Sequence, residues 1–391
     1  MIDIEKKHRY EVLDAFRGIF ALSVVIYHMH VIDSVTELGF FKGSYRFVEF
    51  FFTLSGFVMA HCYVLKNMIS LSDYIISRTF RLFPLHLVML IIFILLECIK
   101  LYQYNHGLVF NNIPFSGNNA FSEIIPNLFL IHSWTFFTKS VSFNFPSWSI
   151  SIEYYVYMIF LLSLLIKNRR SAIWIFLLIG SLVNLLMNIN ILTPEAERGL
   201  SCFFAGVITY KWVLKYQARI DFEKNTFSLL EALSLLLIIF VVSLEIVNSV
   251  ILILVFCVSI IIFSQEKGFI SDILKKKYFN YIGRISYSIY MTHAAVLFCL
   301  ISLFIILGGV FHVNYAPMVN GIRYLTLGDR YVNNIIILIA VSVVIFVSSI
   351  THKYIERPGQ SLGKWIMINK SDGGLLRGWK SFSFMRAAEN K

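Results

Sequence analysis

The stretch LDAFRGIFALSVVIYHMH, residues 13–30, decides the fold. It is apolar enough to form most of a membrane-spanning helix, which needs about 20 such residues. The polar segment before it has no small-residue cleavage site, so a first transmembrane helix is expected rather than a signal peptide. Two ionisable residues interrupt it, Arg17 and His28. They are eleven residues apart, so they share one helix face at a separation of about 16 Å.

The composition agrees with a membrane protein. Of the 391 residues, 58% are hydrophobic and 15% are charged, against about 25% charged in a typical soluble domain. A soluble fold of this length cannot hide so much apolar surface, because folded surface area scales steeply with mass. Disordered, collagen-like and coiled-coil classes are excluded by the same numbers. The sequence therefore predicts an all-α, polytopic integral membrane protein.

The charge balance and the cysteines point to no further class. The net charge of +11 would suggest nucleic acid in a soluble protein, but here basic cytoplasmic loops explain it, and no nucleic-acid partner is expected. The five cysteines lie in or beside apolar runs without a Cys-x-x-Cys pair. We therefore expect neither disulfides nor a metal site.

About ten transmembrane helices are predicted from the apolar runs. A further stretch, 121–137, is shorter and polar-interrupted, and is expected to be re-entrant or interfacial. With the N-terminus in the cytoplasm, 26 of the 34 basic residues fall on the cytoplasmic side and seven outside, so both termini are predicted to be cytoplasmic. The expected spans are 11–32, 47–65, 82–100, 149–166, 171–191, 199–216, 227–247, 249–264, 285–308 and 331–351.

Two regions flank or interrupt these spans. Residues 1–358 are expected to form one membrane-embedded domain, and 359–391 a basic cytoplasmic tail that either lies on anionic lipid or extends freely. The outer segment 101–148 is the longest between spans and is rich in Asn, Ser and aromatic residues. Loops of that length are usually functional or disordered.

Glu153 is a candidate partner for His28. It follows FPSWSIS near the start of a span that enters from outside, so we expect it at the depth of His28. A carboxylate there would orient the imidazole as a general base requires. The alternative is a carboxylate that interacts only with the helix N-terminus.

Other ionisable residues form a second set. Asp14 is placed to pair with Arg17. Arg78 and Arg81 share a helix face at the cytoplasmic mouth of the third span, where they would bind phosphates or simply anchor the helix. His293 lies about two turns into a helix rising from the inside, in a structural or a functional role.

The pair Glu356 and Arg357 ends the last predicted span. The two side chains would form ion pairs or bind phosphate there. The alternative is that this point is only a helix stop set by Pro358.

Together these residues resemble the acyltransferase-3 family of integral membrane acyltransferases. Five segments carry the likeness, in the family's order, from residue 12 to about 358. They are Arg17 with His28; FFFTLSGFVMA (50–60), which contains Ser55; Arg78 and Arg81 with Leu82 and Pro84; Trp148-Ser149-Ile150-Ser151-Ile152-Glu153; and 282–293, which contains Tyr287 and His293.

The resemblance implies ten or so transmembrane helices and transfer of an acyl group, most commonly acetyl, from cytoplasmic acyl-CoA to a hydroxyl of a glycan or lipid-linked glycan. It implies a bacterial inner-membrane location, His28 as the essential histidine, Glu153 as its partner, and Arg17, Arg78 and Arg81 at the acyl donor. Some relatives carry an added SGNH-type domain, and this chain is expected to lack it.

Several alternatives stay open. A covalent acyl-histidine is a variant of general-base catalysis by His28. A secondary transporter or flippase would also place Arg, His and Glu within the membrane, but it predicts an inverted repeat, which the sequence does not show. A non-catalytic scaffold would not need these residues. The acyl group, the acceptor and the oligomeric state, a homodimer included, are not determined.

Overall fold

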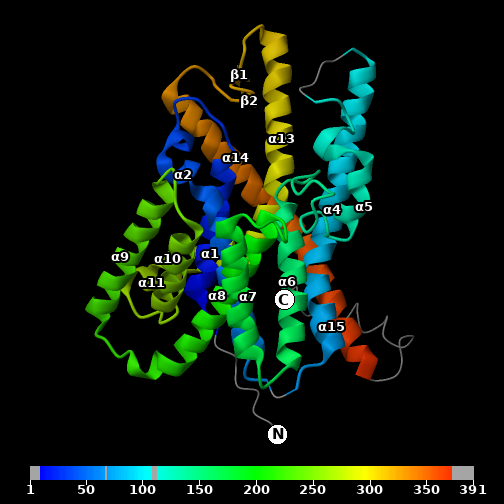
Figure 1. Cartoon of the computed structure of the whole chain (residues 1–391). Helices are drawn as coiled ribbons and strands as arrows, with labels where there is room; N and C mark the ends of the chain where they lie inside the picture. Colours follow the sequence, from blue (N-terminus) through cyan, green and yellow to red (C-terminus); the bar gives the residue numbers. More distant parts are fainter. Residues whose placement is uncertain (1–8, 67, 108–111, 372–391) are drawn as a thin grey trace. The chain divides into compact units, whose positions relative to one another are not determined.

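The computed structural model describes residues 9–66, 68–107 and 112–371 (Figure 1). The chain divides into two compact units, each with its own interior. The first unit comprises 1–64 and 171–348, and the second comprises 65–170 and 349–391. Each is described separately.

The first unit is almost entirely helical. Its one strand pair is a small antiparallel hairpin around Asn320-Gly321, where both residues have positive φ, as a tight hairpin turn requires. Its helices are α1 (Glu11–Tyr27), α2 (Gly39–Lys42), α3 (Phe47–Tyr63), α7 (Arg170–Met187), α8 (Pro194–Tyr216), α9 (Lys224–Ser243), α10 (Ser249–Phe263), α11 (Phe269–Leu274), α12 (Lys277–Arg284), α13 (Ser286–Phe311) and α14 (Arg330–Thr351), with strands β1 (Met318–Val319) and β2 (Ile322–Arg323).

The second unit is built on one long helix, α4. This helix has 35 residues and contains Pro84. The elements of the unit are α4 (Leu71–Asn105), α5 (Ile124–Leu128), α6 (Ser147–Leu165) and α15 (Arg357–Ser371).

Each of the ten predicted spans coincides with a helix, which confirms the all-α class. Six helical runs in the described part of the chain are long and apolar enough to cross a membrane. The chain is therefore an integral membrane protein, while ten as the number of spans and the cytoplasmic termini stay predictions. The six are α4, α6, α7, α9, α13 and the continuous run Arg330–Lys370.

Bare glycine backbone lets helices approach closely in the first unit. A Cβ on Gly56 would overlap the carbonyl oxygen of Phe203, and one on Gly206 would overlap that of Thr53. The glycine of the LSGF segment therefore serves the packing of α3 against α8. The same device joins α1 to α12, where a Cβ on Gly18 would lie 2.7 Å from the backbone of Gly283.

Buried polar side chains hold together the described residues of the segment between α4 and α6. Glu97 accepts hydrogen bonds from the Phe115 N–H at 3.0 Å and the Asn119 amide at 2.9 Å. Asn119 in turn accepts one from the Phe143 N–H at 2.8 Å. Stretch 121–137 begins with a short 3-10 turn, continues as the five-residue helix α5 and ends in non-helical turns. It is therefore not a continuous helical span.

The predicted helix stop at Pro358 is wrong. The chain passes through a π-helical segment, His352–Glu356, directly into α15, and Pro358 lies in the first turn of α15. Proline lacks the N–H that would bond to the preceding turn, and the helix departs from regular α geometry in that turn, at the π-helical segment. Part of the predicted tail is thus a helix whose Gly359 and Gly363 approach Pro84 and Phe80 of α4, and 372–391 lie outside the described residues.

Candidate functional site

Two histidines from distant parts of the sequence meet in the first unit. His28 lies at the C-terminal end of α1, and its Nδ1 is 3.2 Å from Nε2 of His293 on α13. The ring centroids are 5.1 Å apart. His293 is fully buried, and His28 is partly buried. The contact places both rings at one depth.

The hydrogen bonds assign the tautomers of both rings. Nδ1 of His293 lies 2.8 Å from the Tyr290 carbonyl oxygen, which only accepts, so this nitrogen carries the proton. Nε2 of neutral His293 is then an acceptor. It and the Val24 carbonyl, 3.0 Å away, both face Nδ1 of His28, which must therefore donate. The lone pair of His28 is left on Nε2, as a general base requires.

The residues around His293 hold it rigidly. Thr292 bonds to Ser348 at 2.9 Å, and Tyr287 and Tyr290 are buried. Tyr27 packs edge-on against His28 at 4.7 Å. The 282–293 segment therefore forms a packed support under the histidine pair.

Arg17 lies about three turns below His28 on α1. The predicted pair with Asp14 is present, with Arg17 Nη1 3.7 Å from Asp14 Oδ1. Arg9 also binds this carboxylate, at 2.7 Å. Ser55, also in the first unit, is half-buried on α3.

The second unit gathers another set of predicted residues. Tyr157 donates a short hydrogen bond to Glu153, and the Arg78 guanidinium lies over the Tyr157 ring at 5.7 Å. Arg81 follows Arg78 by one turn of α4. The sequence predicts Glu153 at the outer end of its span and Arg78 at the cytoplasmic end. In the structure α4 and α6 run side by side, and Glu153 lies near the level of Arg78.

The serines near Glu153 are structural. Ser151 donates to the Leu130 carbonyl at 2.5 Å and accepts from the Ser133 N–H at 3.3 Å, so it fixes the turn after α5. Ser149 donates to the Pro146 carbonyl at 3.2 Å. Trp148 is partly buried at the start of α6.

Glu356 and Arg357 have different surroundings. Glu356 is buried, 2.9 Å from His352 Nδ1, and it accepts from the Gln360 amide at 3.1 Å. Arg357 is exposed. The Glu356 carboxylate therefore hydrogen-bonds within its own helical run, and its predicted role in ion pairs or phosphate binding stays a prediction.

Two buried histidines of the second unit were not anticipated. His86 and His132 stack in parallel with centroids 6.5 Å apart, and His132 Nε2 lies 3.3 Å from the Ser147 hydroxyl. Burial lowers the pKa of His132 to about 3, with a further contribution from His86. His132 is therefore neutral at physiological pH.

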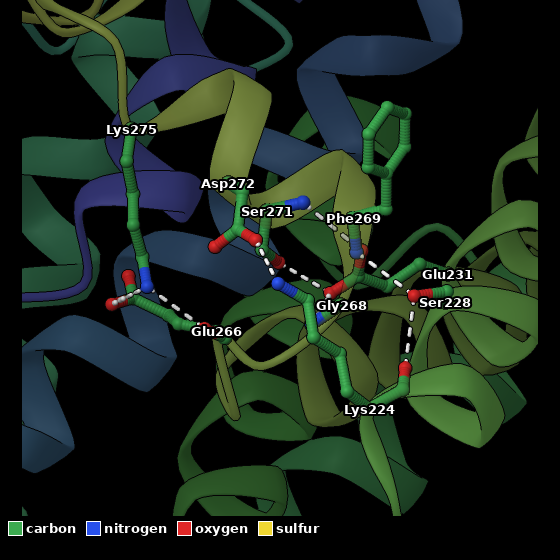
Figure 2. Close-up of polar contacts among 9 residues, drawn as sticks. All are labelled: Lys224, Ser228, Glu231, Glu266, Gly268, Phe269, Ser271, Asp272 and Lys275. Carbon is green, nitrogen blue, oxygen red and sulfur yellow. Dashed lines mark hydrogen bonds and ion pairs between the residues drawn. The ribbon is translucent and has the colours of Figure 1, made fainter.

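Buried Glu231 organises a polar network that was also not anticipated (Figure 2). It accepts hydrogen bonds from the N–H groups of Gly268 at 2.9 Å and Ser271 at 3.0 Å, and from the Ser271 hydroxyl. Glu266 accepts from the N–H of Val12 at 3.0 Å and contacts Lys275. The network fixes α11 on α9 and the α11–α12 corner beside α1.

Both units carry cationic side chains that could bind an anionic ligand. Among the described residues, no three His, Cys, Asp or Glu side chains gather as a metal ion would require. Arginines, which bind phosphate bidentately, occur in both units, at Arg17 and at Arg78 with Arg81.

Comparison with known proteins defines the class. The profile of the acyltransferase-3 family, an acyltransferase domain, matches residues 10–354, and the chain belongs to this family. It is similar to the peptidoglycan O-acetyltransferase OatA of Listeria monocytogenes, at 26% identity over 195 residues. That match covers 45% of this chain and 28% of the relative, so the chain spans less than a third of the relative's length. No solved structure matches the chain.

Proposed function

We propose that this protein transfers an acyl group, acetyl as the first candidate, from cytoplasmic acyl-CoA to a hydroxyl of a cell-envelope glycan in the bacterial inner membrane. Family membership supports acyl transfer over transport or a scaffold role. The relative's name supports O-acetylation of peptidoglycan. The observation that carries the mechanism is the His28–His293 hydrogen bond, which leaves the His28 lone pair on Nε2.

His28 acts as the general base. Its Nε2 takes the proton of the acceptor hydroxyl while that oxygen attacks the thioester carbonyl carbon. The C–S bond then breaks, and the CoA thiolate takes the proton back from the imidazolium, so no net proton is consumed. In the imidazolium state, Nδ1–H still donates to His293, which stabilises the charge.

His293, rather than Glu153, is the orienting residue in this proposal. An orienting carboxylate would bind Nδ1 of His28, but that atom already faces Val24 and His293. Glu153 is bound to Tyr157 beneath Arg78. We assign Glu153 to the support of Arg78, which with Arg81 binds the CoA phosphates.

The function is tested with purified protein in lipid nanodiscs. The assay follows thiol release from acetyl-CoA with and without soluble peptidoglycan fragments, and mass spectrometry follows the acetylated product. We expect thiol release that depends on the acceptor and matches ester formation. Thiol release without an acetylated glycan, or uptake of a solute into vesicles without thioester loss, would contradict the proposal.

A further inference from the structure

A hollow of about 300 Å³ lies at the C-terminal end of α13, on the first unit. It is bounded by the last two turns of α13, the connection that follows, and one residue of the β1–β2 hairpin. Its lining combines aromatic rings with polar side chains, among them Phe304, Gly309, His312, Asn314, Tyr315 and Arg323.

The walls of the hollow are held by specific contacts. His312 ends α13 in the left-handed conformation, and the Val313 N–H donates to the Gly308 carbonyl at 3.0 Å. The Tyr315 ring stands edge-on to Phe304 at 6.5 Å. Arg323 donates to the Ala316 carbonyl at 2.8 Å.

The polar side chains of the hollow are available to a ligand. Within the described part of the chain, the side chains of His312, Asn314 and Tyr315 make no hydrogen bond. An imidazole, an amide and a phenol that both donate and accept therefore line a space beside the Phe304 ring. A sugar is complementary to such a lining, because its hydroxyls can bond to the polar side chains while its apolar C–H face packs against an aromatic ring.

The predicted position of the hollow relative to the membrane is consistent with a glycan ligand. α13 is apolar enough to span, and its other end follows Lys275, Lys276 and Lys277. In the orientation predicted from the basic loops, the hollow opens on the outer side, where envelope glycans are found. Its volume is at the lower end of small-ligand pockets.

We propose that this hollow binds a sugar unit of the acceptor glycan away from the reacting hydroxyl. This rests on the function proposed above. Fifteen residues of α13 separate His293 from Gly308, or about 22 Å along the helix. The acceptor is then an extended glycan rather than a small metabolite, because one molecule must reach both places.

The connection also has a direct link to the catalytic end of α1. The Leu325 N–H, two residues after Arg323, donates to the His30 carbonyl at 2.8 Å, and Val31 forms a bridge with Leu325. The connection that lines the hollow is thus tied to the segment that follows His28.

Gly309 gives a clean test, because a Cβ added there meets no atom within 4 Å. Gly309→Trp fills the hollow without displacing the fold. The matched control is Gly180→Trp on α7, where an added Cβ also meets nothing within 4 Å. Asn314→Ala serves as a second variant that removes one polar group.

Binding is measured by saturation-transfer NMR and titration of the full chain in nanodiscs, with peptidoglycan glycan-strand fragments of two to ten sugars. We expect Gly309→Trp to weaken binding of the long fragments about tenfold and Asn314→Ala severalfold, with Gly180→Trp unchanged. Unchanged affinity in Gly309→Trp overturns the proposal. So does an equal loss for two-sugar fragments, or displacement of a bound lipid without any effect on glycan.

Steady-state kinetics of the same variants then distinguish a failure of this inference from a failure of the proposed function. KM for long fragments should rise in Gly309→Trp, while kcat/KM for two-sugar acceptors stays as in the unsubstituted protein. If no variant transfers acetyl, the function fails while the binding result still decides the role of the hollow.

Discussion

At the residue scale, the account depends on His28 and the atom that carries its lone pair. In the proposed mechanism the Val24 carbonyl and His293, which is 265 residues away in the sequence, together fix that atom. His293 acts through a neutral ring, which stabilises the imidazolium less than a carboxylate would.

His293→Ala should lower kcat by roughly 10- to 10²-fold, because the His28 imidazolium loses a hydrogen-bond acceptor and only the Val24 carbonyl still faces Nδ1–H. KM for acetyl-CoA should change little, since His293 does not contact the donor in this account. His106→Ala, at an exposed histidine, is the control. A His293 variant with the full kcat would remove His293 from the mechanism.

His132 should make stability depend on pH. Its pKa is about 3 in the fold against an ordinary 6.5, so between these values the unfolded chain binds a proton that the folded chain does not. The contribution of His132 to the free energy of unfolding is therefore fully present above pH 6.5. It falls as the pH decreases toward 3, and about 2 kcal/mol is lost at pH 5. Thermal unfolding in detergent at pH 7.5 and 5 measures this.

In His132→Gln that part of the pH dependence should disappear, while His106→Gln should keep it. An identical pH slope in the unsubstituted protein and in His132→Gln would show that another group titrates.

At the element scale, helices were well predicted and their contacts were not. Each of the ten predicted spans coincides with a helix, because hydropathy is a local property. The α11–α12 corner, α15 and the β1–β2 hairpin depend on tertiary contacts, although Asn320-Gly321 was a readable turn sequence.

The polar network of Figure 2 predicts a large effect for one residue. Glu231→Ala should destabilise the protein by about 3 kcal/mol, because two N–H groups and a hydroxyl lose their acceptor in a buried place. Hydrogen exchange should rise at residues 268–276.

Asp272→Asn is the control, at the neighbouring exposed ion pair with Lys224. The hydrogen bond from Lys224 lowers the pKa of Asp272. Because the pair is exposed to solvent, it contributes little to the stability of the fold. If both variants had the same small effect, Glu231 would not organise this corner.

At the scale of the whole molecule, the predicted class and orientation come from composition and charge, whereas the grouping of the site does not. The scarcity of charge pointed to Arg17, His28 and Glu153. The same argument applied to Glu49, Glu97 and Glu231, which are buried and were not singled out. Sequence cannot tell such anchors from catalytic groups, because both are charges in apolar segments.

The orientation can be tested on a chain without native cysteines. Asn320→Cys should react with an impermeant maleimide on intact spheroplasts, and Lys276→Cys only after permeabilisation, because positive charge keeps that loop inside. The opposite labelling pattern would invert the topology.

The central claim is that His28 carries the chemistry. The most direct measurement is acetyl transfer from labelled acetyl-CoA to peptidoglycan fragments by purified His28→Ala, compared with the unsubstituted protein at equal folded amount. The account predicts no transfer above background in His28→Ala with the thermal unfolding midpoint nearly unchanged. Transfer at the unsubstituted rate by a folded His28→Ala protein would contradict it.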